Sequence, residues 1–155
     1  MTATQTKRYQ VRALTLVELP SLAPLLLEFA ALPEAGGLPA EQMAFLLQAR
    51  VQDPSALVLR VDDTETGEAV GFLAAYVLIT PVAREVFIPF AYVRPGIGLA
   101  AGRTLQSAVS LWARAQRASR IGARTTRLEG GKLAEPMAWG RLGYREESVL
   151  LYCDV

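Results

Sequence analysis

The sequence predicts a mixed α+β fold, in which helices pack on a mostly antiparallel sheet that also contains one parallel strand pair. Three observations support this prediction. Apolar runs of strand length alternate with amphipathic segments of helix length. Two consecutive strand-like runs are joined by a short turn, which favours antiparallel pairing. A strand, a long helix and another strand then follow, and such a crossover favours parallel pairing.

The first three elements are a strand and two helices. Tyr9–Leu14 is a short strand with apolar residues. Leu19–Phe29 is an apolar-rich helix, in which Pro20 fits the first turn and Pro24 offers a later start. After a loop rich in proline and glycine, Ala40–Val51 is a second helix with apolar residues at helical spacing on one face.

Three strands follow in the middle of the chain. Ala56–Val61 and Ala69–Thr80 are apolar runs separated by a polar turn, so they predict a hairpin. Val86–Val93 is a third strand that Pro89 interrupts. Because proline cannot donate a backbone hydrogen bond, Pro89 predicts a bulge or the end of pairing.

The remaining elements are two helices and two strands. Arg103 to about Arg120 is the clearest helix, with an apolar face opposite a face of arginines. Ala123–Glu129 predicts the strand that pairs in parallel with Val86–Val93, and the two strands are expected to splay apart near Pro89. Ala134–Leu142 predicts a helix that Gly143 ends, and Glu147–Val155 predicts a final strand.

Length and composition restrict the chemistry. The 155 residues, of which 52% are hydrophobic, suit one domain spanning 1–155. With no histidine and one cysteine, Cys153, the chain lacks the residues of a histidine triad or a thiolate metal cluster, so no metal is expected. Without a targeting segment or a membrane-length apolar run, we expect a soluble, cytoplasmic protein with no membrane partner.

Charge is unevenly distributed although the net charge is only +1. Seven arginines and no acidic residue lie between Arg94 and Arg127. This asymmetry predicts either an anionic ligand or acidic partner, or simply a solvated arginine face. Nucleic acid is not expected, because no aromatic residues alternate with these arginines for base stacking.

A glycine-containing loop precedes the arginine-bearing helix. Small residues from Gly98 to Gly102 would let backbone N–H groups approach a ligand closely, and a helix N-terminus adds partial positive charge. Together they suit phosphate or diphosphate. A plain tight connection between strand and helix explains the same residues, and both interpretations remain open here.

Five segments in this order resemble the GNAT superfamily of acetyl-CoA-dependent N-acetyltransferases. YQVRALTLVELPSLAPLLLEF resembles the first strand and helix of the family, and ALVLRVDDTETGEAVGFLAAYV resembles its second and third strands. AYVRPGIGLAAGRTLQSAVSLWARAQ resembles the diphosphate-binding segment. GARTTRLEG resembles the fifth strand, and MAWGRLGYREES resembles the closing motif. The resemblance implies helices on both faces of the sheet and a parallel strand pair that splays at a cofactor cleft.

The resemblance also implies a cofactor site. Acetyl-CoA or another acyl-CoA would be the cofactor, and an amine the acceptor. The residues expected to bind the cofactor lie at the end of the fourth strand and in the loop and helix start that follow. They are Tyr92, Val93, Gly98, Leu99, Ala100, Ala101, Gly102 and Arg103.

Several positions depart from the family pattern, so no catalytic residue is assigned. Ile97 occupies the first position of the diphosphate motif, where the family has arginine or glutamine; Arg94 and Arg103 are the two candidates to replace that side chain. Val86–Val93 contains no acid to serve as a base, and Trp139 stands where many members have a tyrosine acid.

Two functions therefore remain open. One is an acyl-CoA-dependent N-acyltransferase of weak activity. The other is a protein of the same fold without chemistry, such as a structural component of a larger assembly, for example a phage virion. A homo-oligomer is compatible with both.

Overall fold

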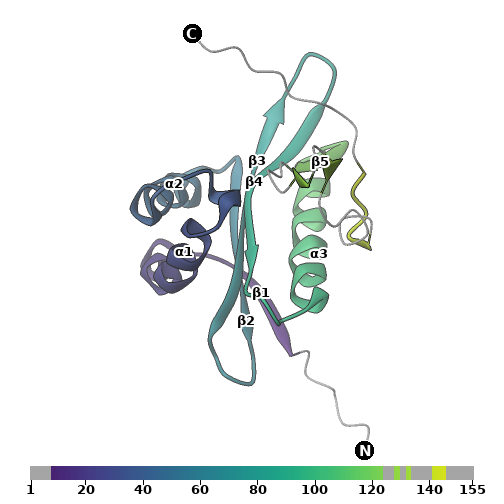
Figure 1. Ribbon diagram of the computed structural model, residues 1–155. Coiled ribbons are helices and arrows are strands. Elements are labelled where there is room, and N and C mark those ends of the chain that lie inside the picture. Colours follow the sequence, from purple (N-terminus) through teal and green to yellow (C-terminus); the bar gives the residue numbers. More distant parts are fainter. Residues whose placement is uncertain (1–7, 124–127, 130–131, 134–140, 146–155) are drawn as a thin grey trace, which may run out of the picture.

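The computed structural model describes residues 8–123, 128–129, 132–133 and 141–145 (Figure 1). A five-stranded sheet in the order β1-β2-β3-β4-β5 forms the centre, with α1 and α2 on one face and α3 on the other. Within the described part of the chain, no helix is long and apolar enough to cross a membrane. The elements are β1 (Tyr9–Ala13), η1 (Leu16–Leu22), α1 (Ala23–Ala30), η2 (Pro33–Ala35), α2 (Ala40–Gln52), β2 (Ala56–Asp63), β3 (Ala69–Ile79), β4 (Arg84–Val93), α3 (Leu99–Ala115), β5 (Arg120–Ala123), β6 (Leu128–Glu129) and β7 (Lys132–Leu133).

Strand pairing confirms the predicted topology. β1 to β4 pair antiparallel in chain order, and β5 pairs in parallel with β4 after the α3 crossover. The expected strand Ala123–Glu129 is wrong in its bounds, because β5 begins at Arg120 and Leu128–Glu129 pairs with β7 in a separate hairpin. The predicted splay involves residues 124–127, which lie outside the described residues.

Other predictions fall on the undescribed part of the C-terminal region. Most of the helix Ala134–Leu142, the strand Glu147–Val155, Trp139 and Cys153 lie outside the described residues. Gly143 is described and has a φ of +87°, the left-handed conformation that favours glycine after a helix.

The first predicted helix is two helices. η1 is a 3₁₀ helix that contains Pro20, and α1 begins next to Pro24. Proline in a continuous α-helix would lose an N–H bond and clash with the carbonyl four residues earlier. Here the Ala23 N–H instead bonds to the Pro20 carbonyl in a 3₁₀ turn, so Pro24 sets the start of α1.

The helix predicted from Arg103 to about Arg120 begins and ends earlier than expected. α3 starts at Leu99, so the small residues of the predicted loop form its first turn. It ends at Ala115 because Arg117 adopts a left-handed conformation with a φ of +57°. The Ala118 N–H bonds to the Ala113 carbonyl at 3.0 Å and the Arg117 N–H to the Arg114 carbonyl at 2.9 Å. These are the two bonds of a Schellman termination.

The predicted irregularity at Pro89 is a β-bulge in β4. Phe90 lies opposite Ala74, and Phe87 lies opposite Tyr76, so Ile88 and Pro89 together face the single residue Ala75. The extra residue exchanges the two faces of the strand. Val86 and Ile88 therefore pack on the α3 side, whereas Phe90 and Tyr92 pack on the α1 side.

Two apolar clusters cover the sheet. The cluster beneath α1 and α2 includes Leu22, Phe29, Met43, Leu47 and Phe72, and the cluster beneath α3 includes Val61, Val86, Ala101, Leu105 and Val109. At the rim of the first cluster, buried Arg60 donates to the Asp62 carboxylate at 2.8 Å and to the Ser21 hydroxyl at 2.7 Å. Arg60 thereby ties η1 to β2.

Candidate functional site

The second half of β4 presents an unusual backbone edge. The Arg94 N–H bonds to the Val70 carbonyl at 2.8 Å, so alternation along the strand turns the N–H and C=O groups of Ala91 and Val93 away from β3. On that edge, the described pairing with β5 ends at Ile88 and Ala123. Ala91 is exposed although it lies within a central strand. Among the described residues, none pairs with the N–H and C=O groups of Ala91 and Val93, and such groups can bind an extended ligand.

The edge continues into an exposed helix N-terminus. Gly96 and Gly98 have φ of +86° and +78°, so both are left-handed turns that favour glycine. Gly98 is the N-cap of α3, and no side chain hydrogen-bonds to the helix start there. The first N–H groups of a helix have no intrahelical partner, and the helix dipole makes this end positive. The end of α3 therefore suits an anion.

Gly102 is the fourth residue of α3, and its surroundings leave room for a larger side chain. A Cβ built at Gly102 would meet nothing within 4 Å. Since glycine inside a helix costs about 1 kcal/mol relative to alanine, its presence needs another reason. A ligand that approaches the helix backbone closely provides one.

The structure brings most of the expected cofactor-binding residues to this edge and helix end. Gly98, Ala100 and Arg103 are exposed, and Leu99, Gly102 and Val93 are half-buried. Two residues are turned away: Ala101 is fully buried beneath α3, and the Tyr92 side chain faces α1. Ala91, which lies in the segment Phe90 to Val93 that the resemblance implies for the pantetheine contact, also belongs to the edge.

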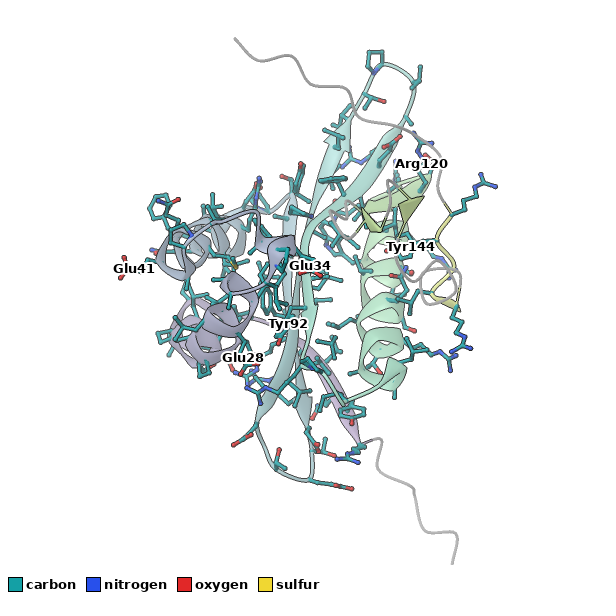
Figure 2. The ribbon with its side chains drawn as sticks, viewed as in Figure 1. Glu28, Glu34, Glu41, Tyr92, Arg120 and Tyr144 are labelled. Atoms are coloured by element: carbon teal, nitrogen blue, oxygen red, sulfur yellow. The ribbon has the colours of Figure 1, made fainter. Side chains whose placement is uncertain are left out.

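A charged cluster lies on the opposite face of the β4 end, where Figure 2 labels Glu28 and Tyr92. Arg94 Nη2 donates to Glu28 Oε1 at 2.7 Å, and Arg94 Nε donates to Oε2 at 3.0 Å. The Tyr92 hydroxyl donates to the same Oε2 at 3.2 Å. Glu28 is 66 residues from Arg94 along the chain, so no sequence pattern could indicate this cluster.

The cluster places the two arginines considered for phosphate on opposite faces of the sheet. Arg94 pairs with Glu28 on the α1 face, whereas Arg103 is exposed on α3. The hydrogen bonds from Arg94 lower the pKa of Glu28 below its ordinary value, against the opposing effect of partial burial. Burial and the bond to Glu28 raise the pKa of Tyr92. Glu28 is therefore a weak base and Tyr92 a weak acid.

The other titratable groups near these elements have structural roles. Glu85, at the outer end of β4, pairs with Arg120 of β5 at 2.6 Å. The Tyr144 hydroxyl donates to Gln106 of α3 at 2.8 Å, and burial raises the pKa of Tyr144. Among the described residues, no three histidine, cysteine, aspartate or glutamate side chains gather as a metal site.

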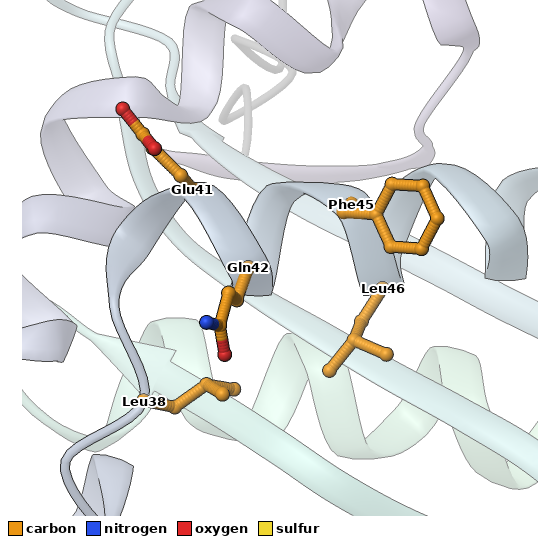
Figure 3. A pocket seen from close by; sticks show the side chains of 5 residues that line it. All are labelled: Leu38, Glu41, Gln42, Phe45 and Leu46. Atoms are coloured by element: carbon orange, nitrogen blue, oxygen red, sulfur yellow. The ribbon is translucent and has the colours of Figure 1, made fainter.

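A separate hollow of about 390 Å³ lies along α2 (Figure 3). Leu38, Glu41, Gln42, Phe45 and Leu46 line it. Phe45 is 70% exposed, so the hollow is an open apolar surface and not an enclosed pocket. None of its lining residues belongs to the β4 edge or to α3.

Comparison with known proteins identifies the architecture. No protein-family model and no curated protein matches the chain. Among solved structures, a ribosomal-protein-alanine N-acetyltransferase from Brucella melitensis superposes with a TM-score of 0.67 at 22% identity, over 94% of this chain and 99% of that one.

Two further neighbours agree with it. AAC(6′)-Iy, solved in complex with the bisubstrate analogue CoA-S-monomethyl-acetylneamine, gives a TM-score of 0.73 at 16% identity over 95% and 98% of the two chains. A GNAT family acetyltransferase from Staphylococcus aureus gives 0.69 at 11% identity over 96% and 99%. These identities establish the architecture and not the activity. With the parallel β4–β5 pair after four antiparallel strands, they show that the chain has the GNAT fold.

Proposed function

We propose that this protein is an acyl-CoA-dependent N-acyltransferase that uses acetyl-CoA or another acyl-CoA and acts on an amine. One observation carries the proposal. The outward backbone edge of β4 runs directly into two left-handed glycines and the uncapped start of α3. An acyl-CoA has a matching order of groups, because amide groups of its pantetheine arm are followed by a diphosphate.

The chain would bind the pantetheine arm and the diphosphate of acyl-CoA through different interactions. The N–H and C=O groups of Ala91 and Val93 would pair with the pantetheine amides as an added strand does. The first-turn amides of α3 would hold the diphosphate, with Arg103 as the charged side-chain partner. Gly98 and Gly102 allow the close approach that such backbone contacts need.

Bound acyl-CoA would supply a thioester carbonyl, at which the acceptor amine forms a C–N bond as the C–S bond breaks. The thiol that leaves is already a fair leaving group, since its pKa is about 8.5. Glu28 holds its charge through Arg94 and is poorly suited to remove the proton of the amine. We therefore expect slow transfer, and faster transfer to amines that are uncharged at neutral pH.

Calorimetric titration with CoA tests the proposal. We expect the wild-type protein to bind CoA, and Gly98→Ala to weaken binding at least tenfold. Gly67→Ala is the matched control, because Gly67 has a φ of +74° and, like Gly98, open space around its Cβ position. Both substitutions place a side chain at a positive φ, so a loss of CoA binding confined to Gly98→Ala indicates a ligand at α3. Equal loss in both variants, or no binding by the wild type, would contradict the proposal.

A second candidate is a structural or interaction protein of the same fold without chemistry. The tip of the β3–β4 hairpin, which extends beyond the helices in Figure 1, favours it. Ile79 and Val82 at this tip are 70% and 89% exposed, and such apolar exposure suits self-association or an assembly partner. Light scattering would support this candidate if the wild type is oligomeric, Ile79→Ser is monomeric and neither binds CoA.

A further inference from the structure

We propose that Glu28 of α1 is a positioning residue for acyl-CoA, because it holds Arg94 and thereby the loop that aims the start of α3. This inference rests on the proposed function. Glu28 lies on the face of the sheet opposite α3, so it would act through Arg94 and not by contact with the cofactor. The ion pair would thus link α1, on one face of the sheet, to the anion-binding helix end on the other.

The loop from Arg94 to Gly98 has few strong anchors of its own. Its internal hydrogen bond, from the Ile97 N–H to the Arg94 carbonyl, is long at 3.4 Å. The Tyr9 hydroxyl lies 3.5 Å from the Ile97 carbonyl, at the limit of a hydrogen bond. Gly96 and Gly98 add conformational freedom on either side of Ile97. Ile97 packs against the apolar cluster beneath α3, and Ala101 anchors the first turn of the helix in that cluster. The hold on Arg94 therefore adds to this packing by setting the course of the backbone between Val93 and Gly98, where the hydrogen bonds are weak.

Arg94 is held at two points. Its backbone N–H bonds to Val70 of β3 at 2.8 Å, and its guanidinium forms a bidentate pair with Glu28 at 2.7 and 3.0 Å. Glu68, in the turn between β2 and β3, lies 3.9 Å from the guanidinium as a weaker partner. A planar guanidinium bound at two oxygens is fixed in direction as well as in distance. Glu28 is therefore the anchor that sets the orientation of this residue.

The position of Arg94 makes its orientation matter to the cofactor edge. Arg94 directly follows Val93, whose N–H and C=O belong to the outward edge of β4, and it precedes Pro95. A residue before proline is restricted to extended conformations, so the chain leaves the strand in a defined direction. Loss of the Glu28 pair would release the side chain of Arg94 while leaving the charge of the loop more positive.

A positioning role for Glu28 and a phosphate-binding role for Arg94 predict opposite changes in the affinity for CoA when Glu28 is replaced. If Glu28 positions the loop, Glu28→Gln weakens CoA binding by about tenfold, the range found for residues that act at a distance. If Arg94 were instead a phosphate ligand that Glu28 restrains, the same substitution would free Arg94 and tighten binding. Calorimetry with CoA on the full chain separates the two, and unchanged or tighter binding overturns the inference.

Glu18→Gln is the matched control. Glu18 of η1 is also a partly exposed glutamate that pairs with an arginine, but its side-chain partners are Arg12 of β1 and Thr15 and not a residue of β4 or the loop before α3. We expect Glu18→Gln to leave the affinity for CoA unchanged. An equal loss in both variants would assign the effect of Glu28→Gln to general stability and overturn the inference. If the wild type itself binds no CoA, the proposed function fails together with it.

Amide hydrogen exchange provides a readout that needs no cofactor. In Glu28→Gln, the amides of residues 96–99 should exchange faster by about tenfold, whereas those of β2 should not change. Arg94→Lys keeps the charge but cannot form the bidentate pair, so it should show the same local acceleration and serves if Glu28→Gln does not fold. Unaltered exchange of residues 96–99 in both variants would overturn the inference.

Discussion

Replacement of Gly102 should have opposite effects on the stability of the fold and on the affinity for CoA. Because a Cβ there meets nothing within 4 Å, Gly102→Ala should raise the free energy of unfolding by about 0.5–1 kcal/mol through helix propensity. The same methyl group would obstruct a close ligand and weaken CoA binding. Urea denaturation and calorimetry measure the two effects.

Ser107→Ala is the control for Gly102→Ala. Ser107 is exposed on the same helix, so its replacement also gains helix propensity but obstructs nothing at the helix start. It should be more stable and bind CoA as the wild type does. If Gly102→Ala binds CoA with unchanged affinity, close approach at α3 is not part of the function.

The Glu28 carboxylate should remain ionised at lower pH than an ordinary glutamate. The bonds from Arg94 lower its pKa from the usual 4.5, so its stabilising contribution is complete above that value and is lost as the pH falls through the lower folded-state pKa. Carbon NMR of the side-chain carboxyl measures the midpoint. In Arg94→Gln the midpoint should rise, and a wild-type midpoint at or above 4.5 would contradict the pairing.

The C-terminal end of α3 could not be predicted from sequence patterns, because no glycine marks it. Arg117 occupies the left-handed position where a helix termination favours glycine. Arg117→Gly should therefore raise the free energy of unfolding by about 1 kcal/mol, because glycine adopts this conformation without steric cost.

The same substitution three residues earlier should have the opposite effect. Arg114 is exposed within α3, so Arg114→Gly should lower the free energy of unfolding by about 1 kcal/mol. Thermal or urea denaturation of both variants gives the comparison. A destabilised Arg117→Gly would show that the arginine side chain makes contacts that outweigh its backbone strain.

The bulge in β4 decides which residues at the end of the strand face α1. Without the extra residue, Phe90 and Tyr92 would face α3, and the alternation of outward backbone groups would shift as well. Pro89 indicates the bulge in the sequence, but which faces it exchanges follows only from the pairing with β3. The bulge places the Tyr92 hydroxyl next to Glu28.

At the scale of the whole molecule, one sheet separates two cores. Val58 is 3% exposed in the cluster beneath α1 and α2, and Val86 is 0% exposed in the cluster beneath α3. Val58→Ala and Val86→Ala should each cost roughly 2 kcal/mol. Because the two clusters share no packed residue, the double variant should lose the sum to within about 0.5 kcal/mol.

Denaturant unfolding of the two single variants and the double variant checks this additivity. A single cooperative transition is expected for all of them, as for most domains of this size. A deviation from the sum above 1 kcal/mol would show that strain passes through the sheet from one face to the other.

From the sequence alone, the order of the elements from β1 to α3 and the pairing of β2, β3 and β4 could be predicted, and so could the parallel strand after α3, although not its bounds. Alternation of apolar residues, the polar turn between β2 and β3, and the crossover helix are local signals, and local signals are readable without a structure. Pro89 also predicted the bulge in β4. Pro24 was given as a later start of the first helix, but the preceding 3₁₀ helix was not predicted. Of the site, the sequence indicated the glycines and Arg103, because small residues before a helix favour anions wherever the helix lies.

Which side chains and backbone groups meet became clear from the packing of the elements. Glu28 and Arg94 are 66 residues apart, and their pairing requires that α1 pack against the end of β4 through apolar contacts that do not involve either charge. That packing pairs Arg94 with Glu28 on the face opposite α3, which is why we propose Arg103 as the phosphate partner. The resemblance placed Val93 at the cofactor site, but the outward direction of the backbone groups of Ala91 and Val93 could not be predicted, because hydrogen-bond direction depends on the register of β4 with β3 and not on side-chain identity.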